Sequence, residues 1–230
     1  MKSIEQLGVP INVIQSSRRR TLSILVSHDE ITIRVPQQLS SKTIETLISK
    51  KIGWIKTKLA YQQQHAPIQH PLQAGDTLPL LDETIFLGFT ETNQITRYAD
   101  NQLWLPKESR QHLTQKQHLV TQWYLEQAND YLPSRTLYWA DMVGKQPSAI
   151  QVKSYKSRWG SCSSKGVVSY NWQIMMAPKR AVDYVIIHEL CHLHELNHSP
   201  QYWQWVARFM PNYQTYQCWF KENAHRLSIA

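Results

Sequence analysis

The chain has 230 residues, 42% of them hydrophobic, and a formal net charge of +8. This is enough apolar material for one large domain or two small ones, and no apolar run is long enough for a membrane span. The first residues lack the apolar core of a signal peptide, and three cysteines at unrelated spacings argue against a disulfide framework, so we expect a cytoplasmic protein. The positive charge suits an acidic partner, such as a nucleic acid or a nucleotide.

Apolar residues alternate with polar ones between residues 11 and 36, which predicts three strands. A helix is predicted to begin at Ser40 or Ser41 and to continue to Leu59, because apolar residues there recur at helical spacing. We expect Trp54 on this helix to pack against the strands.

The next part of the chain is also β-rich. A polar, proline-bearing stretch over residues 62–71 is typical of a linker. Short apolar segments bounded by Gly, Asp or Asn then predict further strands, at residues 77–81, 84–89, 94–98 and 102–105. We therefore expect residues 1–107 to form an antiparallel β module with one helix, and we find no catalytic constellation in it.

The character of the chain changes at about residue 108, where we place the start of a second domain, residues 108–230. Residues 113–132 have helical periodicity, which predicts a helix there. Pro133–Ser134 is expected to break this helix, and residues 136–143 predict a further helical turn or two.

A β-hairpin is predicted ahead of the most distinctive part of the chain. Strand-like residues lie at 150–155 and at 167–172, and residues 163–166 have the composition of a turn. Pro178 is expected to begin the helix that follows, because proline fits the first helical turn.

That helix contains the pattern H-E-x-x-H, at His188, Glu189 and His192. Residues four apart lie one turn apart on the same helix face, so both imidazoles can reach one metal ion. Glu189 is expected to reach a water molecule at that ion and to act as a general base. The pattern lies on an apolar helix, which distinguishes it from a chance match.

His198 is the expected third ligand, because a catalytic zinc takes three protein ligands and keeps one position open. The metzincin spacing requires a glycine where this chain has Glu195, so the metzincin label does not fit. Asn197 can make the turn instead, and Ser199–Pro200 has the form of an N-cap followed by the first turn of another helix. His194 is expected to face away from the ligands.

Several motifs in a fixed order resemble those of one family. They are R-W-G-S-C at residues 158–162, Asn171–Trp172 in the second hairpin strand, the run from Asp183 to Trp203, and the later Met210–Pro211. This order resembles the YgjP-like metallopeptidase family, which is related to the SprT-type zincins. The resemblance is closest over residues 120–225, and residues 17–24 resemble the family's N-terminal part.

The resemblance implies an α+β protein with a compact zincin-like metallopeptidase domain, in which an antiparallel β-hairpin lies over a metal-binding helix. It implies one Zn²⁺ per chain, held by His188, His192 and His198, with Glu189 as the catalytic residue. The implied reaction is hydrolysis of peptide bonds in a polypeptide substrate, which is expected to be extended.

The sequence does not identify the group that stabilises the oxyanion. Arg158 and Tyr202 are candidate donors. The alternative for Arg158 is a structural salt bridge, and the alternative for Tyr202 is a core position packed with Trp203 and Trp205. Residues 168–171 are expected to pair with an extended peptide by strand addition.

Two other functions remain as alternatives. A zinc-activated water also attacks phosphorus, so the chain fits a metal-dependent phosphohydrolase that releases pyrophosphate from nucleoside triphosphates. Against this, it has no P-loop and no carboxylate cluster for Mg²⁺. The second alternative is a zinc-stabilised binding module without catalysis, and the presence of Glu189 beside only three evident ligands favours a catalytic site over it.

Overall fold

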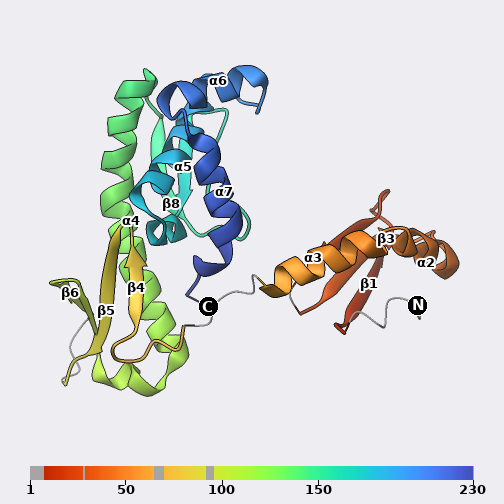
Figure 1. Ribbon diagram of the computed structural model, residues 1–230, viewed down its shortest axis with the longest axis horizontal. Coiled ribbons are helices and arrows are strands. Elements are labelled where there is room, and N and C mark those ends of the chain that lie inside the picture. Colours follow the sequence, from red (N-terminus) through yellow and green to blue (C-terminus); the bar gives the residue numbers. More distant parts are fainter. Residues whose placement is uncertain (1–7, 28, 65–69, 92–95, 230) are drawn as a thin grey trace. The chain divides into compact units, whose positions relative to one another are not determined.

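The computed structural model describes residues 8–27, 29–64, 70–91 and 96–229, and it has the α+β architecture expected from the sequence (Figure 1). The chain divides into two compact units, Met1–Ala66 and Pro67–Ala230. This boundary differs from the expected one at residues 107 and 108. Each unit has a hydrophobic core of its own, and each is described separately below.

The first unit is a three-stranded sheet with two helices. Its strands are β1 (Ile11–Ser16), β2 (Ser23–Val26) and β3 (Ile31–Pro36), which confirms the three predicted strands. They lie in the order β1-β3-β2, with β1 parallel and β2 antiparallel to β3. The core joins the sheet to α2 (Ser41–Ser49) and α3 (Ile52–Gln64), through Ile31, Ile33, Val35, Ile44, Ile48, Ile55 and Leu59.

The single helix predicted for this unit is wrong, since it is divided into α2 and α3 at Lys50 and Lys51. Trp54 does not pack on the strands and is 50% exposed. Ile55 and Leu59 are the residues of α3 that face the core, so the residue just before Ile55 points outward. Part of the predicted linker, residues 65–69, lies outside the described residues.

The second unit begins with a four-stranded sheet in the order β4-β5-β7-β6. Strands β5 and β7 are parallel and the other pairs are antiparallel. Residues 92–95, which include the first two residues of the strand predicted at 94–98, lie outside the described residues. The observed strands are β4 (Thr77–Leu80), β5 (Glu83–Phe89), β6 (Arg97–Ala99) and β7 (Gln102–Leu105).

This sheet belongs with the C-terminal part of the chain for two physical reasons. Its inward side chains share one core with the long helix that follows, and the hydroxyl of Tyr124 on that helix donates to the carbonyl of Pro79. In addition, the Asp82 carboxylate accepts a hydrogen bond of 3.1 Å from the backbone N–H of Lys179, at the start of a later helix. Contacts between residues so far apart in sequence explain why the expected boundary lay some forty residues too late.

The long helix α4 (Leu113–Val143) continues through Pro133, so the predicted break is wrong. Proline removes one helical hydrogen bond, but Leu132 and Thr136 on either side are fully buried and hold the helix against the core. Gly144, with φ of 77°, ends it in the left-handed conformation that glycine favours. Although α4 has 31 residues, no helix in the described part of the chain is both long and apolar enough to cross a membrane.

A second small sheet follows, in the order β8-β10-β9. The turn predicted at residues 163–166 joins the antiparallel strands β9 and β10. The strand predicted at residues 150–155 corresponds to β8, which is parallel to β10, so the prediction that it is one arm of the hairpin is wrong. The helix predicted after Pro178 is also confirmed, and Figure 1 shows it beside α4. The remaining elements are β8 (Ala149–Lys153), β9 (Gly160–Cys162), β10 (Val167–Asn171), α5 (Lys179–Cys191), α6 (Pro200–Phe209) and α7 (Tyr213–Asn223).

A buried ion pair fixes α5 to α4. Asp183 is 1% exposed, and its carboxylate accepts two hydrogen bonds from the Arg135 guanidinium, at 2.6 and 2.7 Å, and one from the Trp139 indole at 2.8 Å. Charge-assisted bidentate pairs of this kind are geometrically specific. Because Asp183 lies on α5 ahead of the H-E-x-x-H pattern, the pair also sets the position of that pattern.

We expect Asp183→Asn to lower the free energy of unfolding by about 3 kcal/mol, because Arg135 and Trp139 would then face an uncharged group in a buried site. Chemical denaturation of the purified chain measures this. Asp130→Asn, an exposed change on α4, is the control and should stay within about 0.5 kcal/mol of wild type. An Asp183→Asn variant as stable as the control would show that the pair is not structural.

Candidate metal centre

Three histidines lie at the junction of α5 and α6. Helix α5 is mostly apolar and is buried on nearly every side, as is typical of a helix inside a core, and it ends with His192 as its C-cap. The predicted corner then follows, in which the Asn197 side chain accepts a hydrogen bond from the backbone of Ser199. The Ser199 hydroxyl caps α6 by accepting from the Tyr202 N–H. This folds His198 back toward α5.

The three imidazoles converge. Ligand atoms of His188, His192 and His198 all lie within 4.8 Å of one another, and no other His, Cys, Asp or Glu of the described residues joins them. The Nε2 atoms of His188 and His198 are 3.1 Å apart. Two ligands of a tetrahedral zinc, each at about 2.05 Å, are about 3.3 Å apart, so this spacing fits one shared ion.

The protonation states of His188 and His192 are suitable for binding a metal ion. Burial, together with the charges of its two histidine neighbours, lowers the pKa of His188 to about 3. Burial lowers the pKa of His192 as well, although its hydrogen bond to the Glu195 carbonyl acts in the opposite direction. That carbonyl can only accept, so Nδ1 of His192 donates at 3.0 Å and Nε2 keeps its lone pair. Both rings are therefore uncharged at neutral pH, so each can offer a nitrogen lone pair to a metal ion.

Glu189 is held in a confined position beside these rings. Its side chain is 5% exposed, and burial raises its pKa to about 8, while the charge of Arg158 lowers it. Strand β9 forms the wall over the carboxylate, and a Cβ atom added to Gly160 would lie only 2.6 Å from Glu189 Oε1. Sequence reasoning missed this role of Gly160, whose only signal was its place in R-W-G-S-C.

The two candidate oxyanion donors lie in different environments. Arg158 is exposed, with its guanidinium over the Tyr155 ring at 5.6 Å, and the described residues include no salt bridge to it. Tyr202 is fully buried, and its hydroxyl donates to the backbone carbonyl of His188 at 2.9 Å. The Tyr202 hydroxyl is thus already used to join α6 to α5, which fits the core alternative considered for this residue.

His194 lies apart from the three converging histidines, as its position in the sequence predicted. Its ring stacks on Trp205 at 4.1 Å with an interplanar angle of 12°. Its Nε2 lies 3.2 Å from the carbonyl of Val143, to which it donates. The residue therefore joins the end of α4 to α6.

The strand that was expected to bind a peptide is not available for pairing. Residues 168–171 lie in β10, which pairs with β8 on one side and with β9 on the other. A central strand has no free edge, so the expected pairing of a peptide with these residues is wrong. Strand β9, which carries Gly160 next to Glu189, lies at the edge of this sheet.

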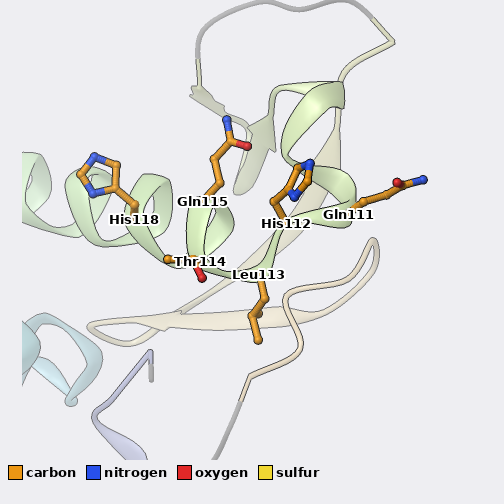
Figure 2. Close-up of a pocket in the computed structure, with 6 residues that line it drawn as sticks. All are labelled: Gln111, His112, Leu113, Thr114, Gln115 and His118. Carbon is orange, nitrogen blue, oxygen red and sulfur yellow. The ribbon is translucent and has the colours of Figure 1, made fainter.

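A surface depression at the start of α4 contains two more histidines, His112 and His118. Figure 2 shows its side chains pointing in different directions, so they do not converge on one point. Arg135, which contacts α5, lies six helical turns further along α4, about 33 Å from Leu113. The depression is therefore separate from the three-histidine cluster.

Comparison with known proteins identifies the family of this chain. A family model described as the YgjP-like metallopeptidase domain matches residues 20–223. Among solved structures, the metallopeptidase zymogen of Pyrococcus abyssi abylysin is 19% identical, and the match covers 41% of this chain and 95% of that one with a TM-score of 0.38. No curated protein matches the chain.

Proposed function

The chain belongs to the YgjP-like metallopeptidase family, and on this premise we propose that it is a zinc-dependent enzyme that hydrolyses peptide bonds. The observation that carries the proposal is the convergence of three imidazoles, with ligand atoms within 4.8 Å of one another, beside a buried glutamate. His188, His192 and His198 are the proposed zinc ligands. With three protein ligands the site has the coordination of a catalytic zinc and not that of a closed structural one.

The chemistry divides between the ion and the protein. Zinc, when bound, supplies Lewis acidity and lowers the pKa of a water molecule in the open position toward about 7. Glu189 accepts a proton from the attacking water and then donates it to the leaving amine. A cation beside Glu189 lowers the pKa of its carboxyl, in the same direction as Arg158, and so favours the carboxylate that a base requires.

Arg158 is the better of the two proposed oxyanion donors, because the hydroxyl of Tyr202 already has a backbone partner. The guanidinium is exposed and acts electrostatically on Glu189. We propose that the substrate is an extended polypeptide lying along the outer edge of β9, where backbone pairing binds peptides with little selection by side chain.

Gly160→Ala is expected to lower kcat for peptide hydrolysis by about 100-fold, the order of effect of a catalytic group displaced by 1 Å. The added methyl group must push the Glu189 carboxylate away from its present position. Zinc content, measured by mass spectrometry, should not change. Gly53→Ala is the matched control, because the space around Gly53 on α3 is open. Full activity of Gly160→Ala would show that the position of the carboxylate is not critical.

The proposed function is tested by assaying the purified full chain, with its metal content measured, against an unstructured polypeptide and a panel of nucleoside triphosphates. We expect polypeptide cleavage that a chelator abolishes and added zinc restores. Release of pyrophosphate without polypeptide cleavage would replace the proposal with the phosphohydrolase alternative. If the chain binds zinc but hydrolyses neither the polypeptide nor the nucleoside triphosphates, the result would favour the zinc-stabilised binding module.

We further propose that the protein is cytoplasmic. We also propose that its first unit binds the acidic partner expected from the net positive charge. Residues 1–66 contain ten Lys and Arg against four Asp and Glu, which places +6 of the total +8 in this unit. Fluorescence anisotropy with a single-stranded oligonucleotide tests this, and the affinity should fall steeply between 50 and 200 mM salt, as phosphate contacts require, by about 10-fold or more. Salt-independent binding, or none, would refute it.

A further inference from the structure

The proposed ligands differ in how their rings are held. His192 is oriented by the hydrogen bond from its Nδ1 to the Glu195 carbonyl. His198 has no hydrogen bond to a carbonyl or a carboxylate among the described residues, and its only polar neighbour is Nε2 of His188. It is also an exposed residue, in the turn between two helices. Its ring plane must therefore be fixed by something other than a polar partner.

Aromatic packing supplies that restraint. The His198 ring stacks on Trp203 with centroids 5.6 Å apart and an interplanar angle of 28°. Trp203 in turn stacks on Tyr213 at 5.1 Å and 13°. Tyr202 contacts the same histidine ring edge-on, at 4.8 Å and 75°. The His198 ring thus lies on a stack of two aromatic rings, with a third ring against its edge.

The stack also connects separate elements. Trp203 lies on the first turns of α6, close to the corner that carries His198, and Tyr213 is the first residue of α7. The Trp203 ring is 5.9 Å from that of His188 as well, so it borders two of the three proposed ligands. An imidazole ligand must present its nitrogen within a narrow range of directions, and neighbours that orient the ring raise its affinity for metal.

We infer that Trp203 is a positioning residue, which fixes the ring plane of His198 by stacking, with Tyr213 as its support, so that Nε2 is directed at the metal position. This inference rests on the proposed function, because it assumes that His198 is a ligand. Trp203 would thus orient His198 by aromatic stacking, as the Glu195 carbonyl orients His192 by a hydrogen bond.

The chain contains a matched control for the test. Trp205 lies on the same helix and stacks even more closely on a histidine, at 4.1 Å, but that histidine is His194, which lies outside the cluster. Replacing either tryptophan by leucine keeps an apolar side chain and removes one tryptophan–histidine stack. Only the replacement of Trp203 should change zinc binding.

The experiment measures the zinc dissociation constant of the full chain by competition with a chelating dye. Trp203→Leu is expected to weaken zinc binding by about 10-fold or more, the range for residues that orient a ligand. Trp203→Phe, which keeps an aromatic face, should recover most of the affinity, and Trp205→Leu should bind as wild type does. The visible spectrum of the Co²⁺-substituted protein should change in Trp203→Leu and not in Trp205→Leu.

The results distinguish a failure of the positioning role of Trp203 from a failure of the proposed zinc ligands. If His198→Ala binds zinc as tightly as wild type, His198 is not a ligand and the ligand set of the proposed function fails. If His198→Ala loses zinc but Trp203→Leu keeps it, or if Trp205→Leu loses as much affinity as Trp203→Leu, the positioning role alone is overturned. Should Trp203→Leu fail to fold, Tyr213→Leu tests the same stack from its far side, with a smaller loss of affinity expected.

Discussion

Glu189→Gln is expected to lower kcat for peptide hydrolysis by about 10²- to 10⁴-fold, the contribution usual for a general base and acid. Glutamine has the same shape, so it fits the confined space beside Gly160. It carries no charge and cannot take up a proton from water. Zinc should remain at one ion per chain, because the proposed ligands are unchanged. Steady-state kinetics with an unstructured polypeptide, alongside metal analysis, measures both quantities.

Glu195→Gln provides the control for that experiment. Glu195 is a half-buried residue near the same histidines, and it contacts His192 through its backbone carbonyl. Its replacement should leave kcat within about twofold of wild type, because the backbone carbonyl that contacts His192 is retained. A fully active Glu189→Gln enzyme would show that another group serves as the base.

His198→Ala is expected to weaken zinc binding by more than about 100-fold. Loss of a residue that only orients a metal ligand weakens binding by up to about 100-fold, and loss of a ligand itself should cost more. Two imidazoles on one helix turn would remain, which leaves two open positions on a tetrahedral ion. Activity at a fixed, low zinc concentration should fall with the metal content. Equilibrium dialysis followed by mass spectrometry measures the loss.

His194→Ala is the matched comparison, since His194 stacks on Trp205 and donates to the Val143 carbonyl outside the cluster. This variant should retain one zinc per chain even if it unfolds at a lower temperature. Equal zinc retention by His198→Ala and His194→Ala would contradict the proposed ligand set.

The local parts of this structure could be predicted from sequence because their causes are local. The 3.6-residue period puts His188 and His192 on one face of α5, and Ser199–Pro200 begins α6 through capping chemistry confined to a few residues. The hairpin of β9 and β10 depends on a turn of four residues between its strands. In each case the neighbours that decide the structure are adjacent in the chain.

The parts that could not be predicted depend on distant contacts. Pro133 is accommodated because the packing of Leu132 and Thr136 offsets a lost hydrogen bond, and periodicity does not measure that packing. The assignment of β4 and β5 to the second unit depends on partners such as Asp82 and Lys179, which are far apart in the sequence.

The same limit applies within the candidate site. Gly160 approaches the Glu189 carboxylate only after β9 is placed beside α5. The stack of His198, Trp203 and Tyr213 forms only when α7 is folded against the corner. The proposed metal ligands could be predicted from their spacing, whereas the residues proposed to orient them could be identified only from the folded chain.

The central claim is that three imidazoles and no other side chain hold one zinc ion, with one position left for water. X-ray absorption at the zinc edge of the full-length chain tests it most directly. The expected result is three nitrogen ligands of imidazole type at about 2.0–2.1 Å and one further light atom. A sulfur ligand at about 2.3 Å or a fourth imidazole would contradict it, because either would close the site.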